Sequence, residues 1–163
     1  MALLDVVIDV SHGQGDIDWR SVAEAGIKVA MVKATEGHTF TDSAWHANLR
    51  GATQAGIKVI PYHFLRAGAA EDQAAHFRDV VGLKHGMAYA LDWEGTRTAA
   101  AADVEQMGRI LAEITRRNPV VIGECRVIRR RRRQQPWSDG NDGYRVIPSA
   151  ESPISPRCRW RIT

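Results

Sequence analysis

The 163-residue sequence lacks the features that mark several common protein classes. No apolar run approaches the roughly 18 residues of a membrane-spanning helix, so we expect no membrane span. The opening residues, MALLDVVIDVSHG, have no basic segment before their apolar run. They therefore predict a strand rather than a signal peptide. For a protein that acts outside the cell, the export route would then not be visible in the sequence.

Metal and nucleotide motifs are also missing. The six histidines show no HxH or HExxH spacing, so we expect no metal site. No GxSxG elbow and no Walker loop occur, and Asp18 stands where a GxGxxG motif starting at Gly13 needs its third glycine. We therefore expect the protein to work without a cofactor.

Cysteine is scarce as well. The two cysteines, Cys125 and Cys158, form no CxxC pair and no metal-spaced cluster. We predict two unpaired thiols, with a disulfide between them as the alternative.

The charge is unevenly distributed along the chain. Residues 1–125 carry 12 Lys and Arg against 16 Asp and Glu, a net charge of −4, whereas residues 126–163 carry 10 Arg against 3 acids, a net charge of +7. The net charge of +3 therefore comes from the end of the chain. Only residues 126–163 are basic enough to attract a nucleic acid, and residues 1–125 are mildly acidic. We therefore expect no nucleic-acid partner.

A thirty-residue repeat organises the first 118 residues. Gly26, Gly56 and Gly86 each precede an apolar run typical of a buried strand, and each follows a segment of helical period. The predicted helices cover residues 18–26, 41–56, 69–82 and 101–118, and residues 119–123 predict a fifth strand. Alternating strands and helices predict an α/β fold with a parallel sheet, either a closed (β/α) barrel or an open doubly wound sheet.

Local signals place the ends of these helices. Asp18 is the predicted N-cap of the first helix and Gly26 its C-terminal stop. Thr41 or Asp42 is the predicted cap of the second helix, and Asn118 ends the fourth.

Polar side chains follow four successive predicted strands at their carboxyl ends, where both architectures place their sites. In strand order they are Asp9, Ser11 and His12, then Lys33, Thr35 and Glu36, then Tyr62, His63 and Phe64, then Asp92 and Glu94. Only Trp93 separates Asp92 from Glu94, and residues two apart in a strand face the same side. We therefore expect these two acids to converge, joined by Asp9.

Clustered carboxylates suit the cleavage of glycosidic bonds. One acid protonates the leaving oxygen while the other stays ionised as a base, a nucleophile or a stabiliser of positive charge. Repulsion between them raises one pKa, so that one group keeps its proton near neutral pH. Tyr62 and Trp93 are aromatic residues that suit the faces of sugars.

Four ordered motifs, VIDVSHGQGDIDW, VKATEGHTFTD, YHFLR and ALDWEG, resemble glycoside hydrolase family 25 from about Val7 to about Gly123. The resemblance implies an irregular TIM-like (β/α) barrel. It also implies a lysozyme, or muramidase, that acts on the cell wall. Such an enzyme cleaves the β-1,4 bond between N-acetylmuramic acid and N-acetylglucosamine in the glycan strands of peptidoglycan.

The resemblance also implies site residues. Glu94 corresponds to the proton donor, Asp92 to a residue that orients the substrate's acetamido group as nucleophile, and Asp9 to the strand-one aspartate. Tyr62 and Glu36 match the family's substrate site, and we add three neighbours as substrate-binding candidates: His12, Lys33 and Trp93. A chitinase-like glycosidase is the rival enzyme, but its DxxDxDxE motif needs aspartates where this chain has Met87 and Ala90.

The C-terminal segment departs from the family pattern. We predict a barrel over residues 5–124, incomplete in its C-terminal strands, and a disordered or aberrant tail over 125–163, which contains five arginines in a row at 129–133. A frameshift near codon 124 is our hypothesis, and a true basic tail is the alternative. The chain would then be a monomeric muramidase, or a catalytically impaired remnant that still binds glycan.

Overall fold

The structure, a computed structural model, describes residues 6–94, 99–123 and 146–147. The strands are β1 (Val7–Val10), β2 (Val29–Glu36), β3 (Phe40–Thr41), β4 (Lys58–Phe64), β5 (Ala90–Trp93), β6 (Val120–Gly123) and β7 (Val146–Ile147). The helices are the short 3₁₀ helix η1 (His12–Gln14), α1 (Trp19–Glu24), α2 (Trp45–Gln54), α3 (Ala70–Val81) and α4 (Ala101–Thr115).

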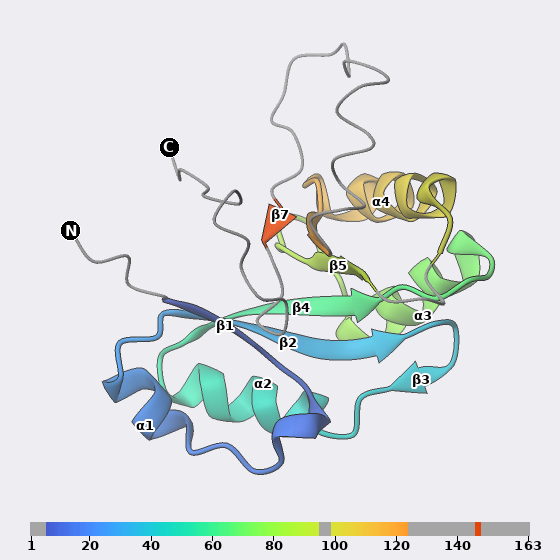
Figure 1. Cartoon of the computed structure of the whole chain (residues 1–163). Helices are drawn as coiled ribbons and strands as arrows, with labels where there is room; N and C mark the ends of the chain where they lie inside the picture. The colour runs from blue at the N-terminus through green and yellow to red at the C-terminus, as the bar shows by residue number, and fades with distance from the viewer. Residues whose placement is uncertain (1–5, 95–98, 124–145, 148–163) are drawn as a thin grey trace, which may run out of the picture.

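One curled sheet organises these elements. Its strand order is β1-β2-β4-β5-β6-β7, with parallel pairing throughout, and β3 pairs antiparallel with β2. The helices pack along the outside of the curl: α2 lies against β2 and β4, α3 against β2 and α4, and α4 against β5 (Figure 1). The predicted α/β fold with a parallel sheet is confirmed, and the described strands form a half-barrel without closing into a full one.

Side chains alternate between the two faces of the sheet. The outer face joins the helices in the main core, which includes Val32, Leu91, Phe77 and Leu111. The inner face carries a smaller apolar cluster of Met31, Tyr62, Ala90 and Ile122. Charged groups on this inner face therefore project away from the helices, above a small apolar floor.

Two of the predicted helix ends are correct. Asp18 caps α1 by accepting hydrogen bonds from the backbone N–H groups of Arg20 and Ser21. Gly26 follows the helix with φ 95°, a left-handed conformation that favours glycine.

Two others are wrong. Helix α2 begins at Trp45 with Ala44 as its N-cap, because Asp42 is buried and directed at the β1 side of the molecule. Helix α4 ends at Thr115, and Arg116 rather than Asn118 provides its left-handed C-cap, with φ 56°.

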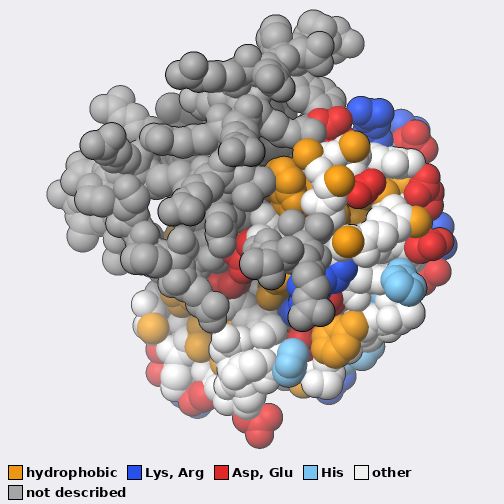
Figure 2. Space-filling model, turned by 45° about the vertical axis from the view of Figure 1, so that its right-hand side comes forward, with side chains coloured by type: hydrophobic (Ala, Val, Ile, Leu, Met, Phe, Trp, Pro, Cys, Tyr) orange, Lys and Arg blue, Asp and Glu red, His pale blue; other side chains and the backbone are white. Residues whose placement is uncertain are grey.

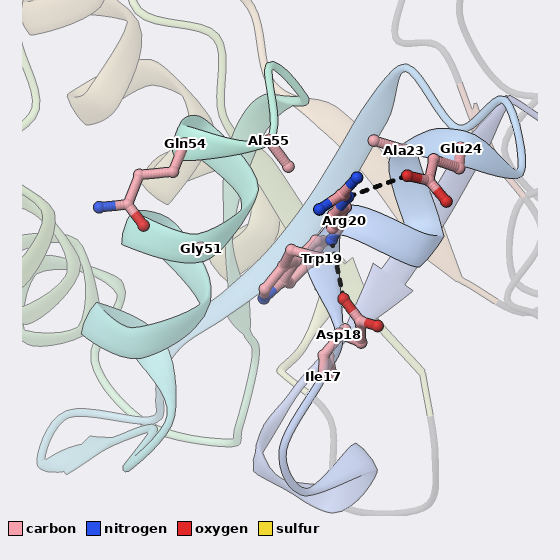
Figure 3. A pocket seen from close by; sticks show the side chains of 9 residues that line it. All are labelled: Ile17, Asp18, Trp19, Arg20, Ala23, Glu24, Gly51, Gln54 and Ala55. Carbon is pink, nitrogen blue, oxygen red and sulfur yellow. Dashed lines mark hydrogen bonds and ion pairs between the residues drawn. The ribbon is translucent and has the colours of Figure 1, made fainter.

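Helices α1 and α2 meet in a close contact beside a shallow groove (Figure 3). The indole of Trp19 lies directly against Gly51 of α2. A β-carbon at Gly51 would stand 2.8 Å from the indole nitrogen and closer still to a ring carbon. Only glycine therefore lets the two helices approach this closely.

Of the predicted tail, only Val146 and Ile147 belong to the described residues. They form β7 and pair with β6, although no strand period was expected there. The predictions for Cys125, for Cys158 and for the rest of the tail lie outside the described residues. In the described part of the chain, no helix is long and apolar enough to cross a membrane.

Candidate active site

Asp92 is the most deeply buried acid on the inner face. It lies in β5 between Phe64 of β4 and Ile122 of β6, and only 6% of it is exposed. Its Oδ1 atom has no hydrogen-bond partner among the described residues. Burial, followed by repulsion from Glu94 and Asp9, raises the pKa of Asp92 to about 8. This carboxyl group therefore holds its proton at neutral pH in the substrate-free protein.

Two further acids share this end of the inner face. Glu94 follows β5 directly and is partly buried, while Asp9 in β1 is exposed. Both lie close enough to raise the pKa of Asp92. The structure thus brings together the three acids whose convergence the strand positions predict.

Tyr62 lies among these acids. It is buried on the inner face of β4, in register with Lys33 on one side and Ala90 on the other. Burial raises the pKa of its phenol, and the charges of Asp92 and Asp9 raise it further. The hydroxyl group therefore stays protonated and can donate a hydrogen bond to a ligand.

A β-bulge places Lys33 and Glu36 on the same face. Residues three apart would face opposite sides of a regular strand. The β2–β4 register shifts between Lys33 and Thr35, so that Ala34 is the extra residue. Lys33 Nζ consequently lies 2.6 Å from Glu36 Oε2, and the lysine is 8% exposed. The bulge converts two strand positions into one partly buried ion pair.

Arg66 completes this charged group and was not predicted as a site residue. Its Nε and Nη2 atoms lie 2.7 and 2.6 Å from Glu36 Oε1, and its guanidinium lies over the Phe64 ring at 4.6 Å. Partial burial alone would raise the pKa of Glu36, but hydrogen bonds from Lys33 and Arg66 outweigh it and lower that pKa. The only sequence signal for Arg66 is its place in the YHFLR motif.

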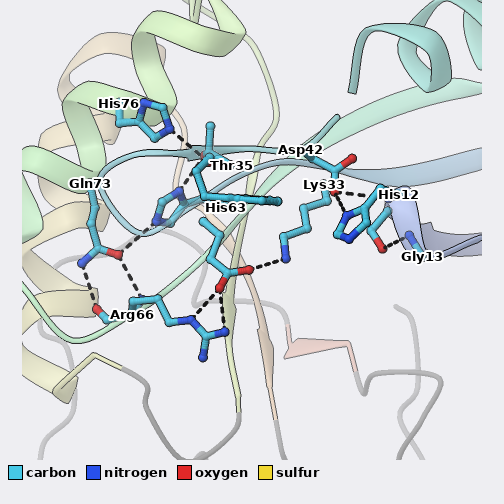
Figure 4. A network of polar contacts seen from close by, with 12 residues as sticks. His12, Gly13, Lys33, Thr35, Asp42, His63, Arg66, Gln73 and His76 are labelled. Atoms are coloured by element: carbon cyan, nitrogen blue, oxygen red, sulfur yellow. Dashed lines mark hydrogen bonds and ion pairs between the residues drawn. The ribbon is translucent and has the colours of Figure 1, made fainter. Parts of the chain in front are cut away.

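Gln73 of α3 fixes the segment that carries Arg66 (Figure 4). Its Oε1 accepts hydrogen bonds from the Arg66 backbone N–H at 3.0 Å and from His63 Nε2 at 3.1 Å, and its Nε2 donates to the Arg66 carbonyl at 2.9 Å. Burial lowers the pKa of His63 to about 4, so the ring is neutral and its Nδ1 accepts from Thr35 Oγ1 at 2.7 Å. A polar network that is buried at Thr35, His63 and Gln73 thus links the outer face to the charged group on the rim.

His12 is positioned by Asp42 (Figure 4). The His12 ring Nδ1 lies 2.7 Å from Asp42 Oδ2, and the His12 backbone N–H donates to the same oxygen at 3.2 Å. The Asp42 side chain is fully buried, whereas half of the His12 side chain is exposed. His12 therefore presents its other ring nitrogen, Nε2, in a fixed orientation at the rim.

Trp93, predicted to bind substrate, points the other way. Its indole packs against the main core on the outer face, and its Nε1 donates to the Ala99 carbonyl at 2.9 Å. These contacts separate it from the acids on the inner face.

The described inner face has the elements of acid–base chemistry on a polar ligand. One acid keeps its proton, a second is more accessible, and Tyr62 offers a hydrogen-bond donor. Within the described residues, no group of three or more His, Cys, Asp or Glu side chains could hold a metal ion. The chemistry that these side chains support is proton transfer and charge stabilisation.

The sequence matches the family described as Glycosyl hydrolases family 25 over residues 8–122. The autolytic lysozyme of Clostridium acetobutylicum is 42% identical over 90 residues, which are 55% of this chain and 28% of that protein. Lysozyme M1 of Streptomyces globisporus is 48% identical over 67 residues, which are 41% of this chain and 23% of that protein. The chain thus spans about a quarter of the length of these two curated relatives.

Solved structures give the same picture. The bacterial lysozyme from Streptomyces coelicolor is similar with a TM-score of 0.64 and 32% identity, covering 71% of this chain and 61% of that one. A family 25 glycosyl hydrolase from Bacillus anthracis is similar with a TM-score of 0.64 and 28% identity, covering 71% of this chain and 58% of that one.

Proposed function

The chain belongs to glycosyl hydrolases family 25, and on this basis we propose that it hydrolyses peptidoglycan. The bond would be the β-1,4 linkage between N-acetylmuramic acid and N-acetylglucosamine. The observation that carries the proposal is the group of Asp9, Asp92 and Glu94 around a buried, protonated Tyr62. The names lysozyme and muramidase among the related proteins agree with it. The glycan strands of the cell wall would then be the partner and the place of action.

The described half-barrel would be part of an irregular TIM-like (β/α) barrel. The chain covers 61% of the lysozyme structure and 58% of the family 25 hydrolase, and its described strands would form one part of such a barrel.

Glu94 would act as the proton donor. Its position just beyond β5, only partly buried, leaves it within reach of a glycosidic oxygen above the inner face. The proton would pass from the Glu94 carboxyl group to that oxygen as the bond from the oxygen to the anomeric carbon breaks. The acetamido oxygen of the substrate would attack the same carbon, and water would later open the resulting ring and return the proton.

Asp92 would orient that acetamido group. Its buried Oδ1, which lacks a partner among the described residues, suits an acetamido N–H donor. Such a bond favours the ionised carboxylate and lowers the pKa of Asp92 from its value of about 8 in the free protein. Substrate binding would thus transfer the proton from Asp92 to Glu94, which then carries the proton that it donates to the glycosidic oxygen.

Four other side chains would contact the glycan at the rim: Tyr62, Glu36, His12 and Lys33. Tyr62 supplies a neutral donor, and Glu36 and Lys33 form the partly buried ion pair beside it. Trp93 is not part of the proposed site, because its contacts hold it on the outer face.

The test compares Glu94→Gln with the wild type on a peptidoglycan suspension. Glutamine keeps the shape but carries no proton to donate, so the rate of turbidity loss should fall by about 10²- to 10⁴-fold. Glu24→Gln, on the exposed surface of α1, is the matched control and should keep full activity. Undiminished lysis by Glu94→Gln would refute the donor assignment. A folded wild type that binds peptidoglycan without cleaving it would favour the impaired glycan-binding remnant.

A further inference from the structure

An exposed aromatic ring lies at the edge of the site. Among the described residues, three large hydrophobic side chains are exposed: Val6, Val7 and Phe40, the last at 43%. The two valines lie at the start of β1, at the opposite end of the sheet from the acids. Phe40 lies in β3 and pairs with Glu36 at the carboxyl end of β2. This exposed ring is therefore beside the proposed site rather than at a random surface position.

Contacts on several sides fix Phe40 in place. The His12 ring lies 6.0 Å away, tilted by 56°, and Lys33 Nζ lies 5.6 Å from the ring centroid. The Phe40 carbonyl accepts a hydrogen bond from His76 Nε2 at 3.1 Å, which ties β3 to α3. On the face shown in Figure 2, hydrophobic side chains lie next to histidines and basic groups. A ring that is held but still exposed is ready to receive a ligand.

His12 lies beside this ring, and its contact with Asp42 determines its tautomer. Because Asp42 accepts from Nδ1, a neutral His12 has its lone pair on Nε2, which can accept a hydrogen bond. The second oxygen of Asp42 accepts from the Ala44 backbone N–H at 3.0 Å. Asp42 therefore joins η1 to the start of α2 and determines which nitrogen of His12 is available.

We propose that Phe40 and His12 form a sugar-binding subsite for an N-acetylhexosamine ring of the glycan, with Asp42 as a positioning residue. The apolar C–H face of the sugar would stack on Phe40, whose ring face is negative. His12 Nε2 would accept a hydrogen bond from a sugar hydroxyl group. This subsite rests on the proposed function, which supplies the glycan.

The position of the subsite defines its effect. Strand β2, which carries the Phe40 hairpin, is separated from β5 by β4 alone, a distance of about 10 Å at the usual strand spacing. Phe40 would therefore contact a sugar next to the cleaved bond rather than the reacting atoms. Loss of such a contact raises KM more than it lowers kcat.

The experiment measures kcat and KM of the full chain on a soluble, uncrosslinked peptidoglycan fragment. Phe40→Ala and Phe40→Leu should each raise KM roughly two- to twelvefold, the range of an aromatic contact, with kcat within about twofold. Phe40→Tyr keeps the ring and should restore the wild-type KM. Val7→Ala, an exposed side chain at the other end of the sheet, should change neither constant.

Asp42→Asn should raise KM as well, and ¹⁵N NMR should show that the His12 proton is no longer confined to Nδ1. A purely structural Asp42 would lower the melting temperature and leave the tautomer unchanged.

The possible results separate the subsite from the proposed function. A wild type that cleaves, together with Phe40→Ala that has an unchanged KM, overturns the subsite and leaves the function standing. For a wild type without cleavage, calorimetry with the same fragment decides. Weaker binding by Phe40→Ala supports the subsite although the hydrolase proposal fails. Equal binding, or none, overturns the subsite as well.

Discussion

Replacing Asp92 with asparagine should stabilise the protein at neutral pH while impairing glycan cleavage. The carboxyl group has a pKa of about 8 in the fold, mainly because it is buried, against an ordinary value of 3.8. The folded protein therefore keeps a proton that the unfolded chain releases above pH 3.8. The contribution of Asp92 to stability is complete below pH 3.8 and is lost as the pH rises towards 8. Asparagine has almost the same shape and is neutral throughout.

The size of the effect follows from the titration. Each pH unit between 3.8 and 7 costs the folded wild type about 1.4 kcal/mol. At pH 7 the Asp92→Asn variant should therefore be more stable by up to about 4 kcal/mol, a large part of the 5 to 15 kcal/mol that holds a typical domain folded. A functional acid that destabilises the fold is the usual compromise at an active site.

The assay is urea unfolding of both proteins at pH 4, 5.5 and 7, followed by tryptophan fluorescence. His63 titrates in the opposite sense. Burial lowers its pKa to about 4, so both proteins lose about 3 kcal/mol as the pH falls from 6.5 to 4. The difference between variant and wild type removes this shared effect and isolates Asp92.

The stability difference should be near zero at pH 4 and largest at pH 7. Asp16→Asn, at an exposed aspartate, is the control and should change stability by less than about 0.5 kcal/mol at every pH. An Asp92→Asn variant no more stable than the wild type at pH 7 would refute the reasoning.

Two further substitutions test the packing around the site. Gly51→Ala should destabilise the fold by about 1 to 3 kcal/mol in a thermal melt, because its β-carbon would overlap the Trp19 indole. The control Gly13→Ala, whose β-carbon would have its nearest neighbour at 3.4 Å, should be nearly neutral. Equal melting temperatures for the Gly51→Ala variant and the wild type would contradict the close helix contact. Gln73→Leu removes one buried hydrogen bond to His63 and two partly buried hydrogen bonds to Arg66. It should cost about 2 to 4 kcal/mol and reduce peptidoglycan lysis in the fraction that stays folded, whereas a stable, fully active variant would show that the network does not support the rim.

The thirty-residue repeat predicted the α/β class and the parallel strands β1, β2, β4, β5 and β6 because each unit carries its own signals. An apolar run forms a buried strand, a glycine with positive φ such as Gly26 or Gly56 precedes it, and an amphipathic helix follows. The meeting of Asp9, Asp92 and Glu94 follows from the same rule, since parallel strands end at one edge. The local sequence pattern was therefore sufficient to predict the strands and helices where the chain repeats a regular unit.

The sequence could not predict the features that depend on irregular or distant contacts. A regular strand would separate Lys33 from Glu36, and the bulge at Ala34 that joins them has no sequence signature. Asp42 looks like a helix cap, yet its partner His12 lies thirty residues earlier. The sequence places Asp92 and Glu94 two residues apart, and their mutual repulsion predicts that one of them holds a proton. Burial, visible only in the fold, determines that Asp92 does so.

Product analysis after digestion of purified peptidoglycan tests the central claim most directly. The products are reduced with borohydride and identified by mass spectrometry, with Glu94→Gln as the parallel control. Cleavage at the proposed bond predicts fragments whose reduced end is N-acetylmuramic acid, formed by the wild type and absent with the variant. Fragments that end in N-acetylglucosamine, or equal products from both proteins, would contradict the account.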